Sequence, residues 1–212
     1  MANAKLKLIL ASASPRRREL IGHLRAPFEV IALSVPENSD AADPVQHSID
    51  IAETKGEAVL EKLRQERSGE DFFIVSADTI VVRDGVIYNK PADRDEARKF
   101  LRELEGRSHS VFTAVSLGLL RAGKAHRISF ADESRVTFER IPPALMERYL
   151  DTGDSLDKAG AYGIQGPSLT FISRVEGSYS TVVGFPLSRF VTESERFLAQ
   201  FYPGEKSWLD LF

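Results

Sequence analysis

Residues 6–19 read LKLILASASPRRRE, and they define the first strand and the first helix of this chain. The run at 6–10 is apolar and short, which predicts a buried strand. Ser14 is a preferred helix N-cap and Pro15 suits the first helical position, so a helix is expected over residues 15–24. The segment therefore predicts a strand, a turn and a helix.

Three arginines, Arg16, Arg17 and Arg18, occupy the start of that helix. The first turn of a helix carries roughly half a positive elementary charge, and a cation there is disfavoured by about 0.3–1 kcal/mol. An anion held jointly by free backbone N–H groups and guanidinium groups would explain the run, and phosphate is the first choice. A solvated basic face of an amphipathic helix is the alternative.

Short strands and helices follow along the rest of the chain. The pattern predicts a mixed α/β fold whose strands come from separated parts of the sequence, with a cleft between two lobes. The expected strands are 28–32, 72–82, 86–88, 109–120, 128–138 and 169–175, and the expected helices are 45–63, 93–104, 142–150 and 186–201.

The composition limits the function. The chain has 212 residues, 42% hydrophobic, and a net charge of −3, which argues against a general nucleic-acid or membrane binder. Cysteine is absent, which excludes thiolate catalysis and zinc–thiolate sites. The four histidines lack metal-ligand spacing, so each is expected to be a surface residue or a satisfied polar group. The apolar segment after Lys5 is too short for a secretion signal, and a cytoplasmic protein is expected.

Asp78 interrupts an apolar run at residues 72–82. A carboxylate in such a setting loses hydration, so it needs a cation, several hydrogen-bond donors or an opening to solvent. A Mg²⁺ ion bridging to phosphate, or a role as base for an attacking water, would meet that need. An aspartate that caps a bulge through local hydrogen bonds is the alternative.

Two later segments carry further polar groups. Pro91 biases Lys90 toward an extended backbone, which suits a phosphate contact, although a solvated loop lysine is the alternative. Residues 157–166, DKAGAYGIQG, hold three glycines that permit close backbone approach or positive φ. The amide of Gln165 has both a donor and an acceptor, and it could pair with the N3–H and carbonyl edge of uracil or thymine. A purely structural glycine-rich turn is again the alternative.

Together, the segments SASPRR, ADT, KP and DKAGAYGIQG resemble the Maf-like nucleotide pyrophosphatases over about residues 6–187. The ending YGIQG is similar to the branch that hydrolyses dTTP and UTP. The resemblance implies one domain over 1–212, with an elongated, two-lobed mixed sheet and flanking helices around a central cleft, similar to the inosine-triphosphate pyrophosphatases. It also implies cleavage of a nucleoside triphosphate, physiological or modified, to the monophosphate and pyrophosphate. The cofactor would be Mg²⁺ or Mn²⁺, and the assembly is often a homodimer.

The resemblance also implies roles for individual residues. Asp78 matches the proton acceptor, and we expect Lys55, Lys90 and Glu37 to assist it, with Asp78 and Glu37 also holding the metal. The positions tied to substrate choice are Arg16, Thr79 and Gln165, and the other cleft positions are Ser12, Arg17 and Lys158.

The chain departs from the family pattern at Asn89, Gly56 and Phe185, and Glu37 lacks the usual preceding acidic residue. The segment 191–212 has no family counterpart that can be placed, and its apolar end is expected to pack against a second subunit. A nucleotide-binding regulator of septum formation is the alternative function. A basic nucleic-acid module is poorly supported.

Overall fold

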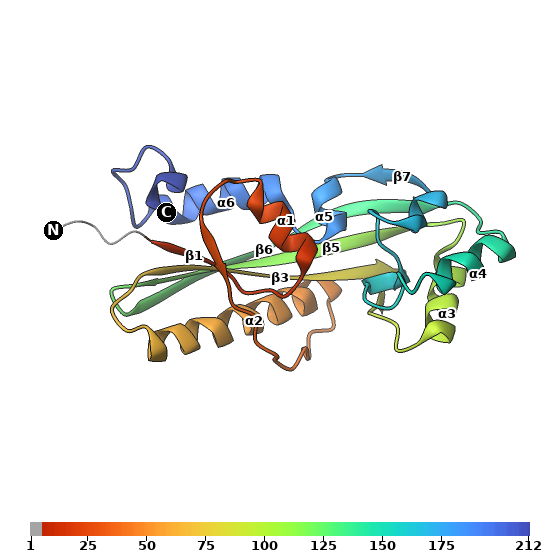
Figure 1. The fold of residues 1–212 in the computed structure, drawn as a ribbon, viewed down its shortest axis with the longest axis horizontal. Helices are drawn as coiled ribbons and strands as arrows, with labels where there is room; N and C mark the ends of the chain where they lie inside the picture. Colours follow the sequence, from red (N-terminus) through yellow and green to blue (C-terminus); the bar gives the residue numbers. More distant parts are fainter. Residues whose placement is uncertain (1–5) are drawn as a thin grey trace.

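The protein is built on a mixed sheet (Figure 1). The computed structural model describes residues 6–212, and Lys5 lies outside the described residues. Within them, seven strands form one sheet, which confirms the expected mixed α/β fold. The strands are β1 (Lys7–Leu10), β2 (Phe28–Val30), β3 (Phe72–Arg83), β4 (Val86–Tyr88), β5 (Ser108–Arg121), β6 (Lys124–Phe138) and β7 (Ile172–Glu176).

The central strand β3 has one continuous edge and one interrupted edge. The strand order is β2-β1-β3-β5-β6-β7, and β4 pairs with β3 off this path. One edge of β3 pairs with β5 over residues 72–82. The other edge pairs with β1 over residues 72–75 and with β4 over residues 81–83. No strand in the described part of the chain covers residues 76–80 on that edge, so the sheet has a gap there.

Helices cover both faces of the sheet (Figure 1). Alternate residues of a strand face opposite sides, so Phe73 and Val75 pack with α1 and α6, whereas Phe72 and Ile74 pack with α2. Both groups of side chains are fully buried. The helices are α1 (Pro15–Gly22), α2 (Pro44–Glu66), α3 (Arg94–Leu104), α4 (Pro143–Asp151), α5 (Tyr179–Val183) and α6 (Leu187–Ala199).

A separate apolar cluster fills the other end of the elongated molecule, where α3 and α4 lie (Figure 1). Phe138, Tyr149 and Phe171 pack edge-to-face there, with Phe138 and Phe171 5.1 Å apart between ring centroids. The sheet thus has a core at each end, and the gap in β3 lies between them.

Three elements differ from the sequence-based expectation. Leu169 belongs to a 3-10 turn over Pro167–Thr170, because Phe171 N–H bonds back to Ser168 O, and the strand starts only at Ile172. Helix α5 was not expected, since its five residues YSTVV favour strands, and Gly184 at φ +117° ends it. The tight turn at Gly123 lets β6 begin at Lys124 rather than at residue 128.

The C-terminal segment packs on its own core, so the expectation that its apolar end covers a second subunit is wrong. Trp208, Leu211 and Phe212 are each less than a tenth exposed. The Trp208 ring lies 6.3 Å from Phe73, and Leu6 N–H donates to Leu211 O. This burial leaves no apolar end for a partner. Among the described helices, none has the length and apolar character that crossing a membrane requires.

Candidate active site

A cavity of about 790 Å³ opens beside the gap in β3. Its walls come from the turn before α1, from α2, from β3 and from the glycine-rich loop that contains the 3-10 turn Ala159–Ala161. Arg18 is exposed and does not line it. Every site residue expected from the sequence lines this cavity: Ser12, Arg16, Arg17, Glu37, Lys55, Asp78, Thr79, Lys90, Lys158 and Gln165.

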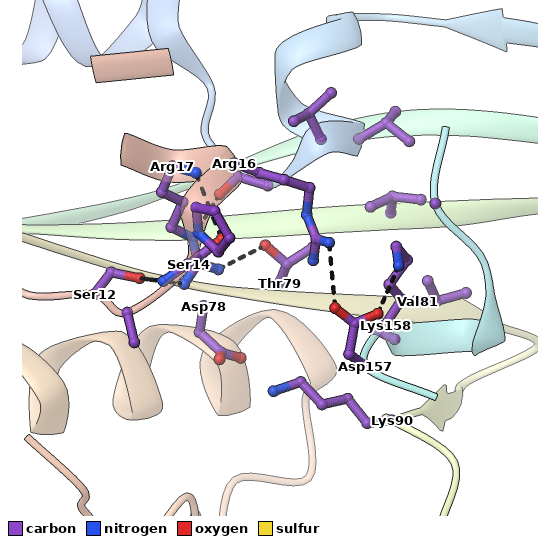
Figure 2. A pocket seen from close by; sticks show the side chains of 18 of the residues that line it. Ser12, Ser14, Arg16, Arg17, Asp78, Thr79, Val81, Lys90, Asp157 and Lys158 are labelled. Carbon is purple, nitrogen blue, oxygen red and sulfur yellow. Dashed lines mark hydrogen bonds and ion pairs between the residues drawn. The ribbon is translucent and has the colours of Figure 1, made fainter. Parts of the chain in front are cut away.

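Asp78 and Thr79 serve opposite faces of the sheet, because neighbouring strand residues alternate (Figure 2). Lys55 on α2 lies on the Asp78 side, with Nζ 2.8 Å from Asp78 Oδ1. Arg17 on α1 lies on the Thr79 side, with Nη2 3.0 Å from Thr79 Oγ1. The gap in the sheet edge lets one cavity reach both faces.

Asp78 is the most buried member of an ion-pair group with Lys55 and Glu37. Its side chain is only 11% exposed, and Lys55 Nζ also contacts Glu37 Oε1 at 3.0 Å. Burial raises the pKa of Glu37, but the hydrogen bond and charge of Lys55, with Lys90 and Arg17 nearby, outweigh it and lower that pKa overall. Of the three possibilities expected for the Asp78 carboxylate, the structure shows two, a cation, Lys55, and an opening to the cavity.

Gly56 allows α2 to lie close to β3. A Cβ at this position would meet Ser76 Oγ at 2.7 Å, and that hydroxyl already donates to Ala52 O. The close approach brings the next residue back along the helix, Lys55, to the Asp78 carboxylate. The departure of Gly56 from the family pattern therefore has a local steric reason.

Arg17 is fixed by three acceptors. Its Nε donates to Gly184 O at 2.8 Å, Nη1 to Ser12 Oγ at 3.2 Å and Nη2 to Thr79 Oγ1. Burial lowers the pKa of this guanidinium, and the charge of Asp78 offsets part of that effect. A guanidinium has five N–H donors, so two remain for an anion, one on each terminal nitrogen.

Lys158 is held by carboxylates of its own loop. Its ammonium bonds to Asp154 Oδ1 at 2.9 Å and to Asp157 Oδ1 at 2.6 Å, and Arg16 lies 3.7 Å from Asp157 across the cavity (Figure 2). Burial raises the pKa of Asp157, while Lys158 and Arg16 lower it, with a net lowering. Sequence reasoning missed both aspartates as partners of Lys158, because segment 154–158 is a turn in which no regular spacing indicates the contact.

The remaining cleft residues are less constrained. The side chains of Gln165 and Lys90 are exposed at the cavity, and neither has a hydrogen-bond partner within residues 6–212.

Tyr162 is buried at the cavity wall, where its hydroxyl lies 2.7 Å from His109 Nε2. The Nδ1 atom of His109 has no partner among the described residues, so this histidine is only half satisfied, and burial lowers its pKa to about 3.

The carboxylates of Asp78 and Glu37 converge on one ammonium, and they are hard oxygen donors of the kind that Mg²⁺ and Mn²⁺ prefer. Residues 6–212 contain no cluster of three or more acidic or histidine ligands that would hold an ion alone. Mg²⁺ is commonly bound by one or two carboxylates together with substrate phosphates. The donor set therefore fits a metal shared with a phosphate ligand.

Comparison with known protein families and with known relatives gives the same family in both cases. The model of the Maf-like protein family matches residues 7–197, beyond the limit of residue 187 expected from the motifs and through most of α6. Relatives named dTTP/UTP pyrophosphatase include those of Thermoanaerobacter sp. (strain X514), 39% identical over 87% of this chain and 93% of the relative, and Deinococcus radiodurans, 40% identical over 86% and 88%. That of Hahella chejuensis is 39% identical over 96% of both chains.

Among solved structures, the nucleoside-triphosphatase / dITP/XTP pyrophosphatase of Mycobacterium abscessus is similar over 93% of this chain and 95% of that chain. It has 14% sequence identity and a TM-score of 0.40.

Proposed function

Because this chain belongs to the Maf-like protein family, we propose that it hydrolyses dTTP and UTP to the monophosphate and pyrophosphate. The observation that carries the proposal is the buried Asp78 carboxylate at the gap in β3, beside a cavity lined by several cations. A pyrophosphatase needs such a pairing, because phosphoryl transfer depends chiefly on positioning and charge neutralisation.

The triphosphate would lie against the start of α1 and the fixed guanidinium of Arg17. Two N–H groups of Arg17 are left for phosphate oxygens, and Lys90 has no competing partner within residues 6–212. Arg16 and Lys158, which form ion pairs with Asp157, would also contact the phosphates when these replace Asp157 as their partner. Bidentate guanidinium contacts to phosphate are strong and directional, which supports this side of the cavity as the anion site.

Asp78 would act as the proton acceptor. Its Oδ1 accepts from Lys55, and its Oδ2 makes no hydrogen bond within the described chain, so one oxygen is left to take a proton. In the proposed step, a water oxygen bonds to the α-phosphorus and gives a proton to Asp78. The bond from the α-phosphorus to the bridging oxygen breaks, and pyrophosphate leaves toward the cationic side.

A divalent cation would be held by Asp78 and Glu37 together with the phosphates. When bound, such an ion neutralises phosphate charge and polarises the phosphoryl oxygens. Lys55 would keep the two carboxylates in place on one side of the cavity.

Gln165 would recognise the pyrimidine. Its exposed amide can donate to the O4 carbonyl and accept from N3–H, a pattern that uracil and thymine share. Modified pyrimidine nucleotides with the same edge would then also be substrates. A homodimeric assembly and a cytoplasmic location stay predictions.

The decisive experiment is pyrophosphate release from a panel of nucleoside triphosphates with Mg²⁺, with Mn²⁺ and with a chelator. We expect UTP and dTTP to be hydrolysed well above the purine nucleotides, and the chelator to abolish release. Binding of UTP without release from any nucleotide would point instead to the regulator considered above, because a pure sensor needs no base.

A further inference from the structure

A line of hydroxyl groups lies behind Arg17. Thr79 Oγ1 is 3.0 Å from Arg17 Nη2 and also 3.0 Å from Thr113 Oγ1 on β5. Thr113 Oγ1 in turn lies 2.8 Å from the carbonyl oxygen of Thr181 on α5. Thr113 and Thr181 are completely buried. The line therefore runs from the cavity across β3 and β5, on one face of the sheet, to α5.

The direction of every proton in this line is fixed. A carbonyl oxygen only accepts, so Thr113 must donate its single hydroxyl proton to Thr181. Thr113 is then left as an acceptor for Thr79, whose own proton is used in that bond. A guanidinium only donates, so Thr79 accepts from Arg17. Thr79 has no proton left to donate to a nucleotide.

The far end of the line is anchored. Thr181 Oγ1 donates to Asp132 Oδ2 at 2.6 Å, which ties α5 to β6. The residue after α5, Gly184, accepts from Arg17 Nε and stands so close that a Cβ there would meet Thr79 Oγ1 at 3.3 Å. The guanidinium is therefore held directly by Gly184, the residue after α5, and by α5 itself through the hydroxyl line.

We infer that Thr113 is a positioning residue of the active site, acting through Thr79 to fix the guanidinium of Arg17. The inference rests on the proposed function and deepens it. Thr79 contributes to substrate binding by presenting Arg17 rather than by donating to the nucleotide. Without the Thr113 hydroxyl, the Thr79 proton is free to turn toward the cavity, and Arg17 loses a preoriented acceptor.

The test compares UTP kinetics for Thr113→Val, which keeps the shape without the hydroxyl, and Thr113→Ser, which keeps the hydroxyl. Loss of one hydrogen bond that orients an anion-binding group corresponds to about a three- to tenfold change in the dissociation constant. We therefore expect KM for UTP to rise by that factor in Thr113→Val. We expect kcat to change less, since the lost phosphate contact weakens the binding of the ground state and of the transition state alike. Thr113→Ser is expected to restore the wild-type KM.

Two controls separate positioning from general damage. Ser116→Ala removes another buried hydroxyl from β5, on the face toward α2, and should leave KM unchanged. In a Thr79→Val background, Thr113→Val should add no further rise in KM, because its route to Arg17 is already cut. Thermal unfolding of each variant is measured in parallel, since Thr113→Val also leaves the Thr181 carbonyl with only the Gly184 N–H as donor.

An unchanged KM in Thr113→Val, or an equal rise in both backgrounds, overturns the inference. Should the valine variant fail to fold, Thr113→Cys, with its weak S–H donor, takes its place in the same comparison. Should the wild type release no pyrophosphate at all, the proposed function fails separately, and the same variants are then compared by calorimetric UTP binding.

Discussion

Asp78 is buried and, among residues 6–212, forms an ion pair with Lys55 alone, and this setting determines what its substitution should do. Asp78→Asn keeps the shape but removes the proton acceptor, so we expect turnover of UTP to fall by about 10²–10⁴-fold while UTP binding largely persists. Steady-state pyrophosphate release and calorimetric binding measure the two effects. Asp84→Asn is the matched control, because Asp84 lies in an exposed turn at φ +52°, which asparagine tolerates. Retained turnover in Asp78→Asn would remove Asp78 from the mechanism.

Gln165 tests how the base is recognised. In Gln165→Glu the carboxylate can still accept from N3–H but no longer donates to O4, so kcat/KM for UTP and dTTP should fall by about 10-fold or more. A nucleotide panel on both proteins measures the change. Gln200→Glu, at the exposed end of α6, should leave the panel unchanged. An unaltered preference in Gln165→Glu would mean that the base is recognised by other residues.

His109 gives the protein a pH-dependent stability. Burial lowers its pKa to about 3, so it is neutral in the folded protein, whereas the unfolded chain takes up a proton near pH 6.5. The unfolded state thus binds more protons below that pH, and folding stability falls as the pH drops from 6.5 toward 3, by about 2 kcal/mol at pH 5.

The corresponding variant is His109→Gln. Urea unfolding at pH 7 and pH 5 should show that it loses this part of the pH dependence, while His23→Gln, an exposed histidine, keeps it. The same pH slope in His109→Gln and wild type would contradict the assignment.

At the scale of elements, the site depends on the gap in β3 and on the glycine-rich loop that faces it. Gly160 has φ +67°, and a Cβ there would lie 2.9–3.1 Å from Val81, where β3 resumes pairing with β4. Gly160 N–H also donates to Asn89 O, which joins the loop to the segment carrying Lys90. Glycine at this position therefore keeps two parts of the cavity wall together.

Gly160→Ala should lower the free energy of unfolding by more than the backbone strain of a positive φ alone would. Gly123→Ala is the matched control, since Gly123 has φ +76° but open space around its Cβ position. We expect about 1 kcal/mol for Gly123→Ala and about 1–3 kcal/mol more for Gly160→Ala, by urea unfolding. Only Gly160→Ala should also lower activity. Equal losses in both variants would show that the contact with Val81 does not constrain the loop.

At the scale of the whole molecule, the C-terminal segment completes the core between β1 and α6. Trp208 packs against Phe73, Phe190 and Phe212, so Trp208→Ala should cost about 3–5 kcal/mol of unfolding free energy. Tyr179→Ala, at an exposed aromatic, should change stability by less than about 0.5 kcal/mol. The loss in Trp208→Ala should be the same at all protein concentrations. If the loss of unfolding free energy in Trp208→Ala disappeared on dilution, the segment would instead be part of a subunit interface.

Local signals in the sequence were enough for most elements, and the family resemblance of the four motifs supplied members of the site such as Lys55 and Glu37, which line the cavity. Each apolar run, the Ser14 cap and each of the four motifs spans only a few consecutive residues, and short-range backbone preferences act over that distance. The segment YSTVV was missed because its local preference favours a strand, whereas packing against the sheet and the turn at Gly184 make it α5.

Only the tertiary structure decided which groups meet. Arg17 and Thr79 are 62 residues apart, Thr113 and Thr181 are 68 apart, and the tail reaches back to Leu6. Such contacts depend on strand register and on which face of β3 each side chain takes, and no local pattern encodes either. The sequence by itself therefore determined the chemistry available to this protein. The fold determined that Lys55 forms an ion pair with Asp78, and that a line of hydroxyl groups orients Arg17.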